Sequence, residues 1–391
     1  MIPLKKNIFL NEQETRAELA RFIVSSNKLS MGEECNKFEE AFASFEGANE
    51  AVLFNSGGSA NLAMLQALKN TGSIKDGDKI GFSALTWSTN VMPIIQLKLQ
   101  PVPIDCEPAT LNVMSNLLQE RLQDTDIRVF FITNALGFSG DLDIIQRICL
   151  ERDIILLEDN CEALGTEMHS GKTGSFGEMS SYSFFVAHHM STIEGGMVCT
   201  NNGEFAEMLR IVRANGWDRN LSREQQARWR SKSNIDSDFY AKYTFHDLGY
   251  NFRPTEITGF LGRYQLPFLR DSITAREKNY IKLESVVKSN PELITLNRSH
   301  ISLLSNFAFP VLCEQPAIRE KYLNKFKSAE IEIRPMIAGN IQKQPFYKKY
   351  VSKLYDLPGV DKIHECGFYC GNYPELTEND ISAISECLRK G

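Results

Sequence analysis

The chain has 391 residues, 42% hydrophobic and 24% charged, the usage of a globular protein that can bury a large core without metals or disulfides. Its 43 Lys and Arg against 49 Asp and Glu give a net charge of −6, which argues against nucleic-acid binding through a basic face. The N-terminus, MIPLKKNIFLNEQ, has no apolar signal region, and no apolar run approaches the roughly 20 residues that span a bilayer. We therefore expect a cytoplasmic protein without a membrane partner.

Nine cysteines, an odd number, are scattered through the chain without a CxxC or CxC motif. This pattern favours reduced, mostly buried thiols over zinc or iron–sulfur ligation, and we predict no metal site.

From about residue 50, short apolar runs alternate with amphipathic stretches, which predicts a mostly parallel sheet with helices on both faces. The predicted strands are 51–54, 79–82, 102–105, 129–133 and 154–158, and the predicted helices include 60–68, 142–151 and 204–213.

Residues 214–246 break this pattern, because they are polar, charged and rich in Trp, Arg and Ser. Such a segment predicts a long irregular insert that is functional, interfacial or disordered. Beyond residue 267 we expect a smaller α/β domain with a helix at 271–287 and strands at 305–311 and 331–334. The predicted division is a large domain at 1–266, with an N-terminal helical segment, and a small domain at 267–391.

The segment SGGSAN follows the first predicted strand and opens a helix. Gly57, Gly58 and the small hydroxyl of Ser59 allow backbone N–H groups to approach an anion at the helix N-terminus. A plain strand-to-helix turn is the alternative.

The segment IILLEDNCEALG ends a buried strand with Glu158 and Asp159. Ligands of open α/β sheets bind at this edge, where a carboxylate can hold a cationic ring nitrogen of a cofactor. Glu162 faces the same place if a helical turn begins here. A solvated acidic cap is the alternative.

His188 and His189 lie between an apolar strand and an EGG turn, in the segment that begins at Ser183. A histidine is more often structural than catalytic, and adjacent imidazoles also suggest a metal, although no supporting ligand cluster is found. No lysine occurs between Lys172 and Lys232, so we expect no amine at this turn.

Two further motifs are less specific. In GYNFRP, Asn251 and Arg253 can bind phosphate or carboxylate, or form an ordinary turn. Trp87, after another predicted strand, can stack on a planar cofactor or lie in the core.

In this order, the motifs resemble the DegT/DnrJ/StrS sugar aminotransferase family of fold-type I pyridoxal-phosphate (PLP) enzymes. The resemblance covers nearly the whole chain. It begins near residues 29–39, where Gly32 and Glu33 precede a Phe-Glu pair, and continues through SGGSAN, TWST, EDNCEALG, SFFVAHH…EGG and GYNFRP. Each piece is weak alone, but their ordered combination is specific.

One departure from the family pattern concerns the reaction. The family usually has its Schiff-base lysine five residues after the Ser of the SF pair, where this chain has His188. The resemblance then implies a cofactor held without a covalent bond, and a histidine here is typical of the sugar 3-dehydratases of the family. The missing Cys-x-Cys implies the type without an iron–sulfur cluster.

The resemblance implies the cofactor pair PLP and pyridoxamine phosphate (PMP), with L-glutamate as amino donor. The implied substrate is a nucleotide-linked 4-keto-6-deoxy sugar, with GDP-4-keto-6-deoxy-D-mannose as the first candidate. The implied reaction removes its C3 hydroxyl. His188 is then the acid–base catalyst, because an imidazole with a pKa of about 6.5 accepts and donates protons near neutrality. A nucleotide-sugar aminotransferase and a catalytically inactive sensor are the alternatives.

The resemblance also assigns the remaining roles. Asn251 would come from the partner subunit, which implies a homodimer with shared active sites. Arg219 and Arg253 would bind either the glutamate carboxylate or the sugar diphosphate, and His189 would orient the site or contact the substrate. The implied cofactor-binding residues are Gly57, Gly58, Ser59, Trp87, Asp159, Glu162, Ser183 and Asn251, and the implied substrate-binding residues are Gly32, Glu33, His189, Arg219 and Arg253.

Overall fold

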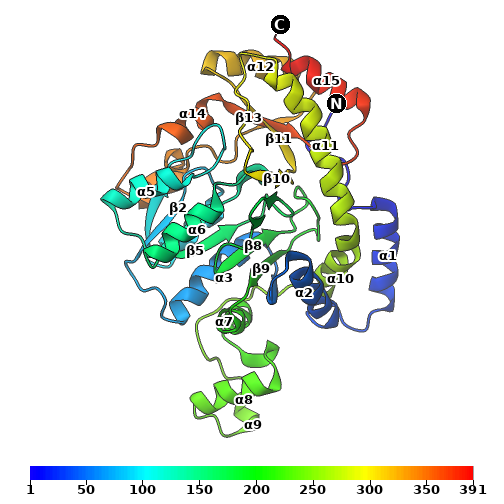
Figure 1. The fold of residues 1–391 in the computed structure, drawn as a ribbon. Coiled ribbons are helices and arrows are strands. Elements are labelled where there is room, and N and C mark those ends of the chain that lie inside the picture. Colours follow the sequence, from blue (N-terminus) through cyan, green and yellow to red (C-terminus); the bar gives the residue numbers. More distant parts are fainter. Residues whose placement is uncertain (391) are drawn as a thin grey trace.

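A computed structural model of the chain describes residues 1–390, with a seven-stranded sheet at its centre in the order β1-β9-β8-β5-β4-β2-β3 (Figure 1). The five strands from β8 to β3 are parallel, β9 is antiparallel to β8, and β1 is antiparallel to β9. The prediction of a mostly parallel α/β sheet is confirmed. The strands are β1 (Glu50–Phe54), β2 (Lys79–Ser83), β3 (Gln100–Ile104), β4 (Val129–Thr133), β5 (Ile155–Asp159), β8 (Met179–Ser183) and β9 (Gly196–Thr200).

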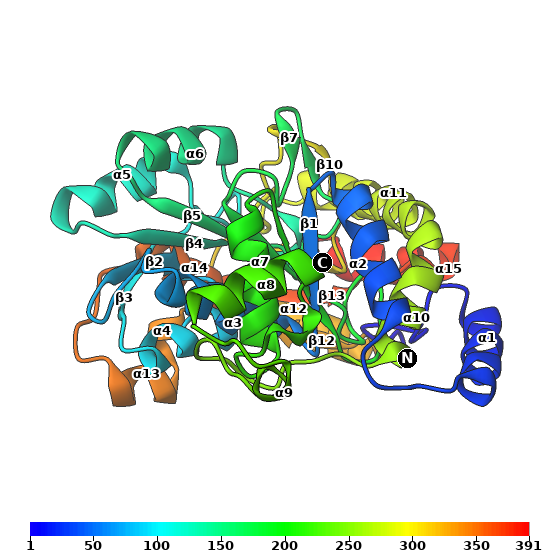
Figure 2. The same ribbon diagram turned by 90° about the horizontal axis from the view of Figure 1, so that it is seen from below.

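Helices cover both faces of this sheet, as the side chains of β4 show. Phe130 and Ile132 belong to a core with α5 and α6, whereas Val129 and Phe131 belong to a second core with α3, α4 and α7 (Figure 2). Both sets are fully buried, which explains why the strand is an unbroken apolar run. These helices are α3 (Gly57–Asn70), α4 (Met92–Gln96), α5 (Ser115–Asp124), α6 (Leu142–Glu151) and α7 (Gly203–Arg213).

The strand before the two histidines lies earlier than predicted. We expected an apolar strand directly before the histidines, but β8 ends at Ser183 and residues 184–190 form a loop. The serines of β8 are buried because they bond within the protein: Ser181 Oγ donates to Asn61 Oδ1 at 2.6 Å. Hydrophobic patterning cannot find a strand whose buried residues are hydroxyls.

A three-stranded antiparallel sheet in the order β11-β13-β12 follows in the C-terminal part. Side chains of this sheet and of the large sheet share one core cluster, so the domain division at 266 and 267 remains a prediction. The elements here are α11 (Leu269–Lys288), β11 (Ala308–Leu312), α12 (Pro316–Ser328), β12 (Ile333–Pro335), α13 (Pro345–Tyr350), α14 (Pro358–Cys366), β13 (Gly367–Gly371) and α15 (Glu378–Leu388).

A second small sheet, β10-β6-β7, and three helices flank the large sheet. Helix α2 packs on α10, and α1 lies at the edge of the molecule (Figure 1). None of the helices within residues 1–390 has the length and apolar character to cross a membrane. These elements are α1 (Glu12–Ser25), α2 (Glu33–Glu46), β6 (Glu167–Met168), β7 (Gly171–Lys172), α10 (Glu256–Gln265) and β10 (Ile301–Leu303).

The insert at 214–246 is more regular than predicted. It forms α8 (Arg223–Lys232) and α9 (Asp238–Ala241), which project from the body of the molecule (Figure 1). Helix α8 begins with a capping box, in which Ser222 and Gln225 bond each other's backbone N–H groups at 2.9 and 3.2 Å. It buries no residue, so it has no apolar face from which a helix could be predicted.

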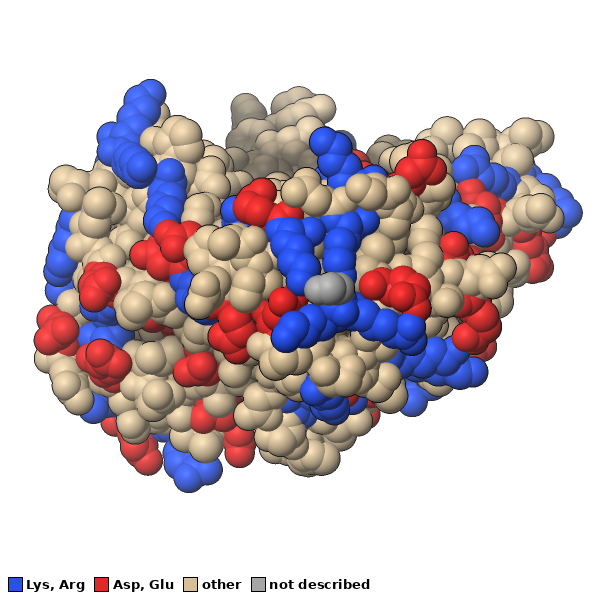
Figure 3. Space-filling view, turned by 90° about the horizontal axis from the view of Figure 1, so that it is seen from above, with Lys and Arg blue, Asp and Glu red and all other residues tan. Residues whose placement is uncertain are grey.

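Basic and acidic side chains are interspersed over much of the surface seen in Figure 3, with one basic cluster near the centre of that view.

Candidate active site

Asp159 ends β5 at the carboxyl edge of the sheet, where it is 4% exposed. Its Oδ2 accepts hydrogen bonds from the amides of Asn61 at 3.0 Å and Asn90 at 2.7 Å, and its Oδ1 accepts one from the Cys161 N–H at 2.9 Å. Within residues 1–390 no cation lies within 4 Å of this carboxylate. A buried carboxylate with hydrogen bonds but without a counter-charge is suited to a cationic ligand atom such as a pyridinium N–H.

Glu158, one residue earlier, points to the other side of the strand. Its carboxylate is fully buried and accepts the backbone N–H groups of Gly174, Phe176 and Gly177 at 2.7, 2.8 and 2.9 Å. It is a structural anchor for that loop, so the alternative of a solvated acidic cap is wrong for this pair.

The SGGSAN segment brings the start of α3 against the end of β8. A Cβ on Gly57 would lie 2.6 Å from Ser183 Cβ and 3.1 Å from Cys161 Sγ, a distance that only glycine permits. Ser56 caps the helix by accepting the Ser59 N–H at 3.1 Å. The N–H groups of Gly57 and Gly58 have no carbonyl four residues back within the helix, so they remain suited to an anion.

Trp87 lies at the same edge, directly before the short helix η1 (Ser88–Asn90) that supplies Asn90 to Asp159. Its side chain is 57% exposed, which excludes the core alternative and leaves the indole face available to a planar ligand.

Glu162 is the second carboxyl group near Asp159. Its Oε2 accepts the Leu136 N–H at 2.8 Å. The pKa of Glu162 is raised to about 8, chiefly by burial and in part by the negative charge of Asp159, although the hydrogen bond from the Leu136 N–H opposes the shift. Near neutrality the group therefore holds a proton, which allows it to donate a hydrogen bond to a ligand oxygen.

His188 lies in the loop after β8, where its N–H donates to the Phe185 carbonyl at 2.9 Å. Its ring packs 5.4 Å from the ring of Phe307, and its Nδ1 is buried without a hydrogen-bond partner among residues 1–390. The pKa of His188 is lowered to about 4, chiefly by burial and in part by the nearby Lys5 charge, whereas Asp159 acts in the opposite direction. The imidazole is therefore neutral at pH 7 and can accept a proton.

His189 lies beneath this loop and is fully buried. Its Nε2 lies 3.1 Å from the Ser305 carbonyl, and burial holds its pKa well below the ordinary value. This placement supports an orienting role more than contact with a substrate.

Gly32 and Glu33 begin α2, where the helix N-terminus already has an internal anion. The Glu256 carboxylate accepts the backbone N–H groups of Gly32, Glu34 and Cys35 at 2.8, 3.1 and 3.2 Å. Glu33 is exposed and pairs with Lys37 at 2.8 Å. The contact of Gly32 and Glu33 with substrate remains a prediction.

The GYNFRP segment lies beside the end of β1, because the Asn55 N–H donates to the Phe252 carbonyl at 2.9 Å. Asn251 is exposed and accepts the Arg253 Nε–H at 3.1 Å. The guanidinium of Arg219 is exposed and stacks 3.8 Å from the ring centroid of Trp217. Within residues 1–390 neither arginine has a carboxylate within 4 Å, so both retain charge for an anion.

The fold brings several residues to this site that no sequence pattern had assigned to it. Asn61 ends the SGGSAN motif and Asn90 directly follows TWST, so the sequence could have indicated both. Lys5 and Phe307 come from distant segments without any motif, and both contact His188. Lys5 overturns the expectation of no amine at the turn, since its Nζ donates to the His188 carbonyl at 2.9 Å.

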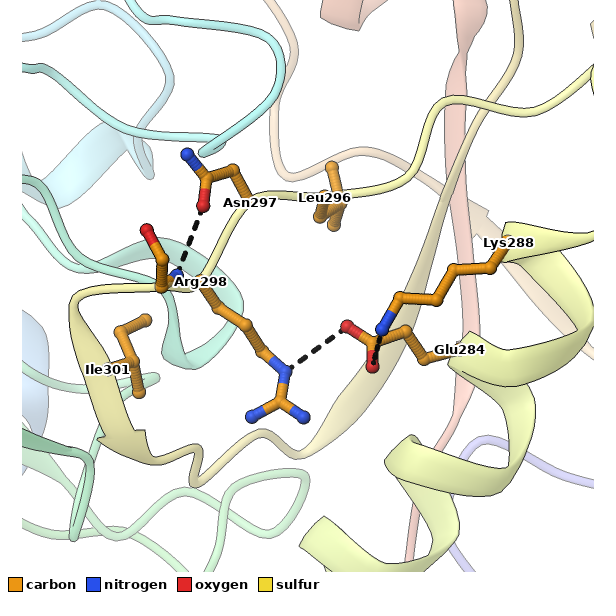
Figure 4. Close-up of a pocket in the computed structure, with 7 residues that line it drawn as sticks. Glu284, Lys288, Leu296, Asn297, Arg298 and Ile301 are labelled. Carbon is orange, nitrogen blue, oxygen red and sulfur yellow. Dashed lines mark hydrogen bonds and ion pairs between the residues drawn. The ribbon is translucent and has the colours of Figure 1, made fainter.

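A separate hollow of about 360 Å³ lies between α11 and the loop before β10 (Figure 4). None of its lining residues belongs to the site described above. Its charges are already paired, because Glu284 accepts from Lys288 at 2.8 Å and Arg298 at 3.2 Å. We therefore assign it a structural role.

The nine cysteines are free and eight of them are buried. In the described part of the chain, no three His, Cys, Asp or Glu side chains are grouped to hold a metal.

The family model described as "DegT/DnrJ/EryC1/StrS aminotransferase family" matches residues 10–389. The chain belongs to this family. It is 32% identical over 371 residues to a GDP-4-keto-6-deoxy-D-mannose 3-dehydratase of Escherichia coli O55:H7, covering 94% of this chain and 95% of that protein. It is 26% identical over 370 residues to a GDP-perosamine synthase of Caulobacter vibrioides, with 92% and 90% covered.

Solved structures of this family superpose closely. A crystal structure of GDP-4-keto-6-deoxymannose-3-dehydratase with a trapped PLP–glutamate geminal diamine has a TM-score of 0.91 at 30% identity, and all of both chains is covered. The predicted family and fold are confirmed over almost the whole chain.

Proposed function

We propose that the protein is a PLP/PMP-dependent 3-dehydratase of a nucleotide-linked 4-keto-6-deoxy sugar, with GDP-4-keto-6-deoxy-D-mannose as first substrate and L-glutamate as amino donor. The observation that carries this proposal is a half-buried, neutral imidazole at position 188, where the family pattern has lysine. The similarity to 3-dehydratases over 94% of the chain supports it.

The residues at the sheet edge fit the cofactor. The Asp159 carboxylate would hold the ring nitrogen protonated, Trp87 would stack on the ring, and Glu162 would face its phenolic oxygen. The start of α3 at Gly57, Gly58 and Ser59 would bind the phosphate together with Ser183. When bound, the amine form of the cofactor supplies an amine for a ketone and an electron sink that permits loss of the neighbouring hydroxyl.

His188 would move the proton. Its neutral imidazole has a lone pair with which to accept a proton from carbon. Once protonated, it is more acidic than an ordinary imidazolium, because burial and the Lys5 charge both disfavour the cation. It can therefore pass the proton to a departing hydroxyl. A less acidic imidazolium would transfer its proton less readily.

The anionic groups of the substrates would bind at Arg219 and Arg253, which lack carboxylate partners among residues 1–390. Gly32, Glu33 and His189 remain predicted contacts or orienting groups. The active unit would be a homodimer in which Asn251 of the partner subunit completes the phosphate site. Exposed apolar side chains on the projecting insert, and one just beyond it, support this assembly, since such patches mark interfaces. They are Phe239, Tyr240, Tyr243 and Phe245 of the insert and the following Leu248, each 57–74% exposed.

The activity is tested with the purified protein, PLP, glutamate and a panel of 4-keto-6-deoxy nucleotide sugars. We expect glutamate to bleach the PLP absorbance and the GDP sugar to yield a 3-deoxy-4-keto product with release of ammonia. An amino sugar as final product would identify an aminotransferase. A protein that binds PLP but turns over no sugar would be a sensor.

The shared sites are tested by subunit mixing. Neither a His188→Asn protein nor an Asn251→Ala protein should be active alone. Their mixture should regain activity, because one hybrid site receives both intact residues. A mixture that exchanges subunits but stays inactive would show that each site is built from one chain.

A further inference from the structure

The N-terminal segment, residues 1–5, is fixed beside the β11-β13-β12 sheet, next to the loop that carries His188. The Ile2 N–H donates to the Glu330 carbonyl and the Glu332 N–H to the Ile2 carbonyl, both at 2.9 Å. The Leu4 N–H donates to Glu332 Oε2 at 3.0 Å. Gly371 of β13 allows the segment to pass closely, since a Cβ there would lie 2.5 Å from the Leu4 carbonyl oxygen. These contacts determine where the next residue, Lys5, begins.

From this anchored position, the Lys5 side chain reaches the loop that carries His188. Its Nζ donates to the His188 carbonyl at 2.9 Å and also to the Val186 carbonyl. The two acceptors are main-chain atoms on either side of Ala187. A single amine therefore attaches both ends of the tripeptide 186–188 to the N-terminal segment, which is itself fixed beside the β11-β13-β12 sheet. The loop's own bond, from the His188 N–H to the Phe185 carbonyl, closes the turn but does not attach it to the rest of the protein.

We infer that Lys5 is a positioning residue: it clamps the backbone of residues 186–188 and thereby holds the His188 imidazole in place. The clamp itself stands on these contacts, whereas its importance for turnover rests on the proposed function of His188.

The charges around the clamp give it a second effect. Lys5 faces Arg276, Glu375 and Glu12. Its pKa is lowered to about 7, chiefly by burial and in part by the Arg276 charge, whereas the two carboxylates raise it. His188 faces Lys5, Asp159 and Arg276. A protonated Lys5 therefore both strengthens the two hydrogen bonds and opposes protonation of the imidazole.

The test compares Lys5→Met, Lys5→Arg and the matched control Lys6→Met in the full-length protein without substrate. Lys6 is exposed, so its replacement removes the same charge without removing the clamp. Hydrogen exchange of the peptide covering 184–190 should speed up by about ten-fold in Lys5→Met, the size expected when charge-assisted hydrogen bonds are lost. It should change little in Lys5→Arg and not at all in Lys6→Met.

The imidazole titration gives a readout that general loosening would not produce. With labelled histidine and His188→Asn for assignment, the NMR midpoint of His188 should rise in Lys5→Met and stay at the wild-type value in Lys6→Met. In turnover, kcat of Lys5→Met should fall while KM for the sugar is retained, and Lys5→Arg should recover part of it. In wild type, the exchange protection of the loop, corrected for intrinsic rates, should decline from pH 6 to pH 9.

Unchanged exchange and an unchanged midpoint in folded Lys5→Met would overturn the inference. If that variant does not fold, the wild-type pH series decides, and constant protection from pH 6 to pH 9 would refute the clamp. A measurable clamp in a protein that dehydrates none of the sugars would refute the proposed function and leave the positioning of the loop intact.

Discussion

Replacing Glu162 with Gln should stabilise the cofactor-free protein, and the stabilisation should grow as the pH rises. The pKa of this carboxyl group is about 8 in the folded chain against an ordinary 4.5, with burial as the main cause. Between these values the unfolded chain has released a proton that the folded chain retains. Raising the pH through this window therefore favours unfolding of the wild type. A glutamine has no such proton, and its carbonyl can still accept the Leu136 N–H.

The size of the effect follows from proton linkage. Each pH unit between the unfolded and folded pKa corresponds to about 1.4 kcal/mol, and the slope flattens near the folded pKa. The advantage of Glu162→Gln should therefore grow by about 2 kcal/mol from pH 6 to pH 8. For a chain of 391 residues, this corresponds to about 2 to 3 °C in the difference between the two melting temperatures.

Calorimetric or fluorescence melts of both cofactor-free proteins at pH 6, 7 and 8 measure this difference. Glu378→Gln is the matched control, because Glu378 is exposed and its pKa is lowered by Lys282. It is ionised in both states above pH 6, so its melting difference should be independent of pH in this range. A constant difference for Glu162→Gln as well would show that Glu162 is ionised at neutrality, and the proposed donor role would be wrong.

Three further substitutions test the site. Asp159→Asn should reduce turnover by several orders of magnitude while the fold, followed by circular dichroism, survives; near-normal turnover would exclude its role at the ring nitrogen. His188→Lys should form a Schiff base with PLP that borohydride fixes on the introduced lysine, whereas an adduct on Lys5 of the wild type, seen by peptide mass spectrometry, would show that the amine site is misplaced. Gly57→Ala should cost about 1–3 kcal/mol by overpacking against Ser183, and equilibrium dialysis should show weaker PLP binding; unchanged affinity would separate this turn from the phosphate.

The sequence was sufficient to predict the sheet and its functional edge. Five strands of the large sheet, β1 to β5, were predicted within two residues of their observed bounds, because buried strands are short apolar runs. Asp159 could be placed at the carboxyl edge because ligands of parallel sheets bind there. The same reasoning could not separate Glu158 from Asp159, since the direction of each side chain depends on the register with β4 and β8.

The features that escaped prediction depend on contacts between distant segments or on polar residues. Helix α8 has no apolar face, and β8 buries serines. The Glu256 carboxylate occupies the start of α2 from more than 200 residues away, so Gly32 could not be distinguished from an open anion site. Such pairings leave no local signal in periodicity or spacing.

The chemistry at position 188 depends on two properties: the type of side chain, which the motif gives, and its pKa, which the fold determines. The motif replaces an amine with an imidazole, which removes the covalent anchor for the cofactor. The fold then decides how acidic that imidazole is once protonated, because burial and the Lys5 amine lower its pKa to about 4 from the ordinary 6.5. A histidine in an open loop would hold a captured proton more tightly. Between Phe307 and Lys5, the neutral imidazole is a weaker base and the imidazolium a stronger acid than in water. This favours transfer of the proton to a leaving hydroxyl over its retention. The N-terminal residues, which no motif includes, therefore belong to the description of this active site.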